Sequence, residues 1–248
     1  MILVTWNCCR GPYPKKLALL ASLSADIAVL QECPRPPAES DHCLWFGDNP
    51  RQGIAIIAKP PYSLKKLPTR RAVPKFIVPV AVTGPRSFSM LAVWSKTRQK
   101  HNYVEAVVKA VRVYRELLAA GPAVVLGDFN SNTIWDESHL ADRNHSALVR
   151  MLESLNLVSA YHAHFNEKHG AETRPTYYFQ WKERQPFHLD YCFVPADWLD
   201  TRTRVEVAGY EDWRLHSDHR PLIVELPEES PHSQRVAVRD KRDVRAIG

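Results

Sequence analysis

The sequence of 248 residues has no apolar run approaching the ~20 residues that a membrane-spanning helix needs. It begins with Met1-Ile-Leu-Val-Thr-Trp-Asn7, which carries neither a basic leader nor a small-residue cleavage site. This opening segment is therefore predicted to be the first strand of the fold rather than a signal peptide. Together these absences predict a cytoplasmic protein without a membrane partner.

Glycine and regularly spaced cysteines are also scarce. The chain has 9 Gly against 19 Pro, so many of its loops are stiffened by proline. Its five cysteines show no C-x-x-C spacing and have no histidine at ligand spacing nearby, which disfavours a structural zinc site built on them. An odd number of cysteines without an export signal predicts free thiols in a reducing compartment.

Hydrophobic residues and positive charge are what the chain does have. Hydrophobic residues make up 45% of the sequence, which is enough for a substantial core. The formal net charge is +6 and the sequence pI is about 9.1. A basic balance of this kind favours polyanionic partners, nucleic acid above all.

Apolar strands alternate with amphipathic helices along the chain. Residues 1–5 and 26–30 are predicted to be strands joined by a helix over 16–23, and a right-handed crossover would bring both strand ends to one edge of a parallel pair. Helical spacing extends over residues 103–120 and 146–155. Further strands are predicted over residues 44–46, 53–58, 76–82, 87–94, 123–128, 205–207 and 222–226, with 176–181 and 188–195 as an antiparallel pair.

No shift in composition marks a linker within this alternation. Residues 1–227 are therefore predicted to form one layered α/β domain. From Glu228 onward the chain loses apolar periodicity, so residues 228–248 are predicted to be a polar tail.

Polar residues stand at the ends of the predicted strands. They are Asn7, Glu32, Asp128 with Asn130, Asp190, and Asp218 with His219. Asp128 and Asn130 are two residues apart, so their side chains would point the same way from one strand. Carboxylates that converge repel one another unless a cation lies among them. Oxygen ligands suit Mg²⁺ or Mn²⁺, whereas zinc would call for cysteine or several histidines.

His219 has a natural partner in Asp190. A histidine held by a carboxylate keeps one tautomer and a raised pKa, so it can transfer a proton or, as a cation, stabilise charge on a phosphate.

Five motifs occur in the order and rough spacing of the endonuclease/exonuclease/phosphatase superfamily. They are Thr5-Trp-Asn7, Val29-Leu-Gln-Glu32, Leu126-Gly-Asp-Phe-Asn-Ser131, Leu189-Asp-Tyr191 and Ser217-Asp-His-Arg-Pro-Leu222. The chain thus resembles, over residues 1–226, a superfamily that includes pancreatic deoxyribonuclease-like enzymes, abasic-site endonucleases and inositol-phosphate 5-phosphatases. The resemblance implies a four-layer α/β sandwich, in which two central, mostly antiparallel mixed sheets are flanked by helices and the site lies at one end.

The resemblance also implies roles for the polar residues. Glu32 looks like the principal ligand of Mg²⁺ or Mn²⁺, with Asn7 beside it and Asp218 near the metal. Asp128 resembles the residue that orients or deprotonates the attacking water, and Asn130 the amide that grips the scissile phosphate. Asp190 and His219 resemble the carboxylate and histidine pair of the superfamily.

One position departs from the superfamily pattern. Many members have a histidine or tyrosine at the end of the strand before the long central helix, where this chain has Trp94. An indole N–H can only donate a hydrogen bond, so a second general-acid route through this position is in doubt. His101 in the next loop could substitute as a donor, but a solvated histidine at the start of the helix is the favoured reading. Arg10, Arg174, Tyr177 and Trp94 are the candidate substrate contacts.

These features predict a hydrolase of phosphate esters that depends on Mg²⁺ or Mn²⁺, and they favour a nuclease. A phosphatase or phosphodiesterase acting on a small-molecule or lipid phosphate is the alternative. A catalytically inactive binding module is a third reading. It is disfavoured because the metal and acid–base positions are all filled.

Overall fold

The computed structural model describes residues 1–96 and 103–228. His101 and most of the predicted tail, residues 229–248, lie outside this range. Within it, every helix is too short or too polar to cross a membrane.

The first sheet has six strands in the order β13-β14-β1-β2-β4-β3. Its only parallel pair among the described residues is β1 (Ile2–Asn7) with β2 (Ile27–Cys33), which α1 (Tyr13–Ala21) connects. Asn7 lies opposite Gln31 in this pair, so the predicted unit and its shared strand edge are confirmed. The other strands are β3 (Cys43–Asn49), β4 (Gln52–Ala58), β13 (Arg204–Val207) and β14 (Leu222–Glu225).

The second sheet also has six strands, in the order β5-β6-β7-β8-β12-β9. Here the parallel pair is β7 (Phe88–Trp94) with β8 (Ala123–Asp128), and α2 (Tyr103–Val113) and α3 (Arg115–Ala119) lie between them in the chain. The remaining strands are antiparallel to their neighbours: β5 (Ser63–Lys66), β6 (Ile77–Thr83), β9 (Leu157–Ser159) and β12 (Asp190–Pro195).

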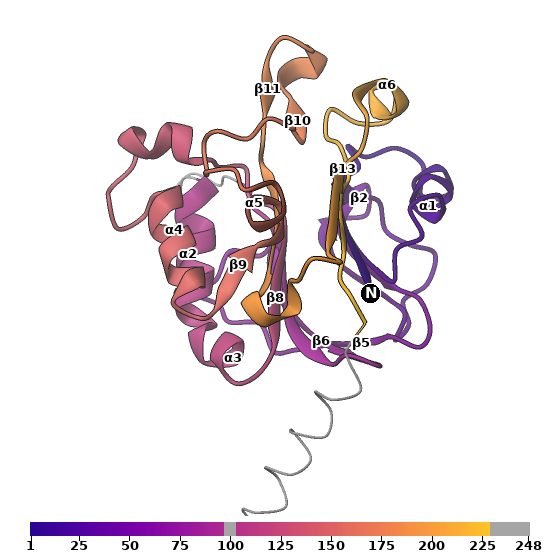
Figure 1. The fold of residues 1–248 in the computed structure, drawn as a ribbon. Helices are drawn as coiled ribbons and strands as arrows, with labels where there is room; N and C mark the ends of the chain where they lie inside the picture. The colour runs from indigo at the N-terminus through magenta and orange to yellow at the C-terminus, as the bar shows by residue number, and fades with distance from the viewer. Residues whose placement is uncertain (97–102, 229–248) are drawn as a thin grey trace, which may run out of the picture.

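The two sheets pack face to face and form the middle layers of a four-layer sandwich (Figure 1). Alternate residues of their strands fill the core between them, as the two-residue period of a strand requires. Helices α2 and α4 (His145–Glu153) cover the outer face of the second sheet. On the outer face of the first sheet lie α1 and the short α6 (Tyr210–Trp213). The predicted fold class is confirmed.

The predicted pairing of residues 176–181 with 188–195 is wrong. The ribbon is made by β10 (Tyr177–Tyr178) and β11 (Pro186–Phe187) instead. All six residues of β12 are buried, so this strand needs neighbours on both sides, and it lies between β8 and β9. The apolar alternation was visible in the sequence, but it could not identify which strand would complete the sheet.

One helical prediction also needs correction. The helix predicted over 103–120 is interrupted at Tyr114, whose hydroxyl accepts a hydrogen bond from the backbone N–H of Arg70 at 3.1 Å. Helix α5 (Ala160–Phe165), which follows directly on β9, was not predicted.

Candidate active site

Strand register brings the predicted polar residues of the second sheet into one row. Asp128 at the end of β8 lies directly opposite Trp94 of β7 and Asp190 of β12. Val124 and Leu126 face the first sheet, so Asp128 two residues later faces it too. Glycine at position 127 lets β8 lie close to β7, because a Cβ there would overlap the carbonyl group of Val93.

Asp128 is the centre of a hydrogen-bond network. Its Oδ2 accepts from Asn7 Nδ2 at 3.0 Å and from Asn130 Nδ2 at 2.9 Å, while its Oδ1 accepts from the backbone N–H of Asn130 at 2.9 Å. Asn130 adopts a left-handed backbone (φ +47°), which asparagine tolerates better than most residues. Its Nδ2 also lies 2.9 Å from the carbonyl oxygen of Ser95. Residues from both sheets therefore fix the orientation of the Asp128 carboxylate.

Asp190 and His219 form the predicted pair. Asp190 Oδ2 lies 2.9 Å from His219 Nδ1, and both residues are buried. The second oxygen of Asp190, Oδ1, is buried without a hydrogen-bond partner among the described residues. Ser217 positions the histidine, because its hydroxyl donates to the carbonyl of Asn7 at 2.6 Å and accepts from the His219 N–H at 3.0 Å. The aromatic ring of Tyr177 packs 4.5 Å from the imidazole.

Burial and neighbouring charges tune the acid–base groups of this cluster. Burial raises the pKa of Asp128 to about 7; His219 opposes the rise and Asp190 adds to it. Burial alone would lower the pKa of His219, but the carboxylates of Asp190 and Asp128 outweigh it and raise the pKa to about 9. Near neutral pH, Asp128 can therefore act as a base while His219 carries a proton.

Glu32 and Asp218 lie at the edge of this cluster. Glu32, the second-to-last residue of β2, has a left-handed backbone (φ +51°), and its side chain is 22% exposed. Burial, together with the carboxylates of Asp218 and Glu32, raises the pKa of the nearby Cys9 thiol to about 11, so both acids lie near the same thiol. Arg10 Nε lies 3.2 Å from Glu32 Oε2.

This donor set suits a hard cation. Glu32, Asp218 and Asn7 offer oxygen atoms, as Mg²⁺ and Mn²⁺ prefer. Deeper in the site, Asp128, Asp190 and His219 each place one possible ligand atom within 4.8 Å of the other two. In the described part of the chain, no such group of three includes Glu32 or Asp218. The metal-ligand roles predicted for these two residues and Asn7 stay predictions.

The four candidate substrate contacts are placed very differently. Tyr177 lies against His219, and Arg10 is exposed beside Glu32. Arg174 lies farther along the chain on a loop, where it contacts Glu167 at 3.1 Å and the ring of Phe165. Trp94 is only 3% exposed in the core between the sheets and packs on Phe76, so its side chain has almost no surface to offer a substrate.

Sequence reasoning missed two supporting residues. Thr176 is fully buried, and its hydroxyl accepts from the backbone N–H groups of Leu189 and Asp190 at 2.9 and 3.1 Å. Gln31, next to the predicted ligand Glu32, donates to the Thr5 hydroxyl at 2.9 Å and has a buried Oε1 without a partner among the described residues. Neither residue belongs to a charged pattern that would have drawn attention to it.

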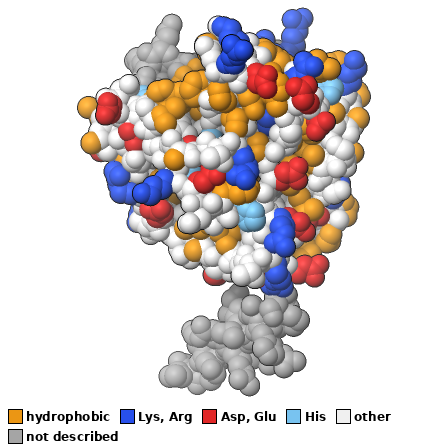
Figure 2. All heavy atoms as spheres, turned by 45° about the horizontal axis from the view of Figure 1, so that its top comes forward, with side chains coloured by type: hydrophobic (Ala, Val, Ile, Leu, Met, Phe, Trp, Pro, Cys, Tyr) orange, Lys and Arg blue, Asp and Glu red, His pale blue; other side chains and the backbone are white. Residues whose placement is uncertain are grey.

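A cavity of about 640 Å³ opens beside Asn130. Its aromatic lining includes Trp135, Tyr177, Phe179 and Phe187, and the rings of Trp135 and Phe187 lie 5.2 Å apart. The β10–β11 ribbon forms part of this wall and rises above the strand ends (Figure 1). The end of the molecule that carries this ribbon is turned forward in Figure 2. Apolar side chains gather over the upper part of this face, with Lys and Arg side chains around them.

Comparisons with known proteins agree with this geometry. Residues 4–219 match the Endonuclease/Exonuclease/phosphatase family. No curated protein matches the chain by sequence. Solved structures with the same fold include a 3'-5' exonuclease from Neisseria meningitidis, 22% identical with a TM-score of 0.63, covering 91% of this chain and 99% of that one.

Two further structures share the fold. An AP endonuclease from Archaeoglobus fulgidus is 15% identical with a TM-score of 0.64, covering 91% of this chain and 99% of that one. A 3' phosphatase from Neisseria bound to a product DNA hairpin is 21% identical with a TM-score of 0.59, covering 92% and 99%. The family match spans most of the sequence and includes the strand ends described above. The chain belongs to the endonuclease/exonuclease/phosphatase family.

Proposed function

We propose that this family member is a nuclease that hydrolyses phosphodiester bonds of nucleic acid with the help of Mg²⁺ or Mn²⁺. The observation that carries the proposal is the buried cluster of Asp128, Asp190 and His219, oriented by Asn7 and Asn130. Such a cluster is costly to bury, and its pKa values suit proton transfer near neutral pH.

The catalytic roles follow from what each group can donate or accept. Asp128, with a pKa of about 7, orients the attacking water toward the phosphorus atom and accepts a proton from that water. His219, protonated below about pH 9, donates to a non-bridging phosphate oxygen as negative charge builds there. Asp190 holds the imidazole through Nδ1, which leaves Nε2 for the substrate.

Asn130 would contribute a second donor. Its Nδ2 bonds to Asp128 and to the Ser95 carbonyl, so turning the amide toward a phosphate would exchange one of these bonds for a charge-assisted one. A hard divalent cation held by Glu32, with Asn7 and Asp218 beside it, would supply charge neutralisation at the phosphate.

Three features favour nucleic acid as the substrate. The net charge of +6 favours a polyanion. The aromatic wall of the cavity beside Asn130 offers rings on which bases can stack. The structural relatives include a 3'-5' exonuclease and an AP endonuclease, and a third, a 3' phosphatase, is bound to a product DNA hairpin.

A substrate panel tests the proposal. Plasmid DNA, single-stranded DNA and RNA oligonucleotides and p-nitrophenyl phosphate are incubated with the full chain, with Mg²⁺ or Mn²⁺ and separately with a chelator. We expect cation-dependent cleavage of at least one nucleic acid and little turnover of the small ester. Rapid hydrolysis of p-nitrophenyl phosphate with every nucleic acid left intact would instead support the small-molecule phosphatase.

A further inference from the structure

A second polar cluster lies on the opposite side of β12 from Asp190. It consists of His145 at the start of α4, His162 on α5, His169 in the following loop and His188 just before β12. The ring centroids of all four lie 4.9–6.2 Å from that of Tyr191, a buried residue on the outer face of the second sheet. Four of the 11 histidines of the chain thus gather around one tyrosine.

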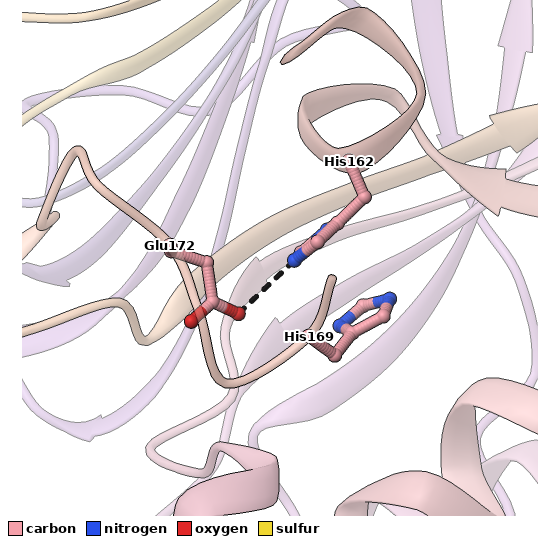
Figure 3. Close-up of side chains that lie close together, drawn as sticks. All are labelled: His162, His169 and Glu172. Carbon is pink, nitrogen blue, oxygen red and sulfur yellow. Dashed lines mark hydrogen bonds and ion pairs between the residues drawn. The ribbon is translucent and has the colours of Figure 1, made fainter. Parts of the chain in front are cut away.

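Two of these histidines and a glutamate have the spacing of metal ligands. His162, His169 and Glu172 each place one ligand atom within 4.8 Å of the other two. His162 Nε2 lies 3.0 Å from Glu172 Oε1, and the rings of His162 and His169 face each other with centroids 3.5 Å apart (Figure 3). The ligand atoms therefore come from one helix and the loop that follows it.

Reorientation of the His169 ring would complete a metal site. Zinc bonds of about 2.0–2.1 Å in a tetrahedron place ligand atoms about 3.3 Å apart. The His162–Glu172 separation is already close to that value. The widest separation would have to close by at most about 1.5 Å, and the His169 ring would have to turn out of its stack on His162, because an imidazole binds a metal in the plane of its ring. Gly170 follows His169 with a φ of +90°, so the chain bends sharply there.

Several buried ring nitrogens here have no hydrogen-bond partner among the described residues. They are His169 Nδ1, His145 Nε2 and His188 Nε2. An unpaired buried polar atom is costly, and it is uncommon in a native fold. A neutral imidazole nitrogen has the free electron pair that a metal ligand needs.

Outer contacts hold the possible ligands in place. His162 Nδ1 lies 2.7 Å from the Ser159 hydroxyl, and Glu172 Oε2 accepts from Asn132 Nδ2 at 3.1 Å. The side chains of His162 and Glu172 are only 8% and 4% exposed. Metal sites typically show such hydrogen bonds behind their ligands, because these bonds fix the tautomer and the orientation.

We propose that His162, His169 and Glu172 bind one divalent transition-metal ion of the zinc class. Two imidazoles and one carboxylate suit such an ion, whereas Mg²⁺ prefers oxygen ligands. A fourth position remains for water. Asn132 joins Glu172 to the His188 carbonyl and the Tyr191 hydroxyl, each at 3.1 Å, so the ion would brace the loop after Asn130 and the start of β12.

Metal titration of the full chain tests this site. The chain is stripped with a chelator and titrated with Co²⁺ in excess Mg²⁺, because tetrahedral Co²⁺ absorbs far more strongly in the visible than six-coordinate Co²⁺. Displacement by Zn²⁺ then gives the zinc affinity. We expect one tight equivalent with a tetrahedral spectrum. The variants His169→Ala and Glu172→Gln should each bind Zn²⁺ at least about 100-fold more weakly, since even outer partners of a metal site contribute 10–100-fold.

Two controls separate this site from others. His164 is exposed on the same helix, so His164→Ala should bind Zn²⁺ as the wild type does. Glu32→Gln removes the predicted Mg²⁺ ligand and should leave the tetrahedral spectrum intact, so failure of the zinc site and failure of the proposed nuclease site can be told apart. Circular dichroism of the metal-free variants verifies folding. The proposal is overturned if the wild type takes up no tight Zn²⁺, if both ligand variants keep wild-type affinity, or if Glu32→Gln abolishes binding.

Discussion

Strand β12 separates two polar clusters that are built in different ways. On its inner side, Asp190 meets Asp128 and His219, and the imidazolium of His219 partly offsets the two carboxylates. On its outer side, four histidines surround Tyr191, and three of their buried ring nitrogens have no partner among the described residues. The inner cluster is joined by strand register, whereas the outer one comes from a helix start, a short helix and loops.

This difference shows two ways in which a fold can hold polar groups away from water. A charged cluster is tolerable when its members hydrogen-bond to one another, and its pKa values then become useful for proton transfer. In a cluster of imidazoles, by contrast, the unpaired nitrogens remain costly until water or a metal occupies them. The inner cluster is therefore expected to carry the chemistry, and the outer one to stabilise the loops beneath it.

The largest expected effect comes from Asp128→Asn, which removes the proposed base and nearly preserves the shape of the side chain. Turnover should fall about 10²–10⁴-fold, the range for a positioned acid–base group. Single-turnover kinetics on the best nucleic-acid substrate measure the loss. Asp142→Asn, at a side chain that is 60% exposed, is the matched control and should retain wild-type turnover. Full turnover in Asp128→Asn would remove Asp128 from the mechanism.

Asn132 links the loop after Asn130 to the outer cluster, so Asn132→Ala should weaken that link. The change removes donors to Glu172, the His188 carbonyl and the Tyr191 hydroxyl, together with the cap on Ile134 N–H. We expect the free energy of unfolding to fall by at least about 2 kcal/mol, because a lost cap and several hydrogen bonds each contribute about 1 kcal/mol. Urea unfolding measures the change. A stability equal to that of the wild type would show that the outer cluster is independent of this side chain.

Thr176→Val tests whether Asp190 needs its local support. Valine has almost the same shape, but it leaves the buried N–H groups of Leu189 and Asp190 without their acceptor. The expected cost is about 1–3 kcal/mol in the free energy of unfolding, with a smaller loss of turnover. Thr201→Val, at an exposed threonine, provides the comparison in the same denaturant series.

The smallest expected effect is a shift of the pH–rate profile. Wild-type turnover should rise as the pH passes about 7, where Asp128 loses its proton, and fall above about 9, where His219 loses its own. Asp190 raises the pKa values of both Asp128 and His219, so Asp190→Asn should move the whole profile to lower pH. The alkaline limb should shift downward by at least about one pH unit. An alkaline limb unchanged in Asp190→Asn would mean that another group sets it.

Much of the fold and of the inner cluster was predictable because both depend on local periodicity. The apolar runs before Asn7, Glu32 and Asp128 identified strands that end in polar residues, and the β1–α1–β2 unit followed from connection rules. The partners of β12 could not be predicted, since alternation defines the faces of a strand and says nothing of its neighbours. The burial of Trp94 could not be predicted either, since alternation does not say what covers a given face of a strand.

The sequence alone determined which residue types were available for chemistry, because acids, amides and a histidine recur at the ends of its apolar runs. Only the tertiary structure decided their pKa values and their partners. Burial and contacts at about 3 Å depend on strands that are more than 100 residues apart in the chain, as Asn7 and Asp128 are. It also brought His145, His162, His169 and His188 around Tyr191, because contacts between a helix, loops and a sheet face follow no sequence period.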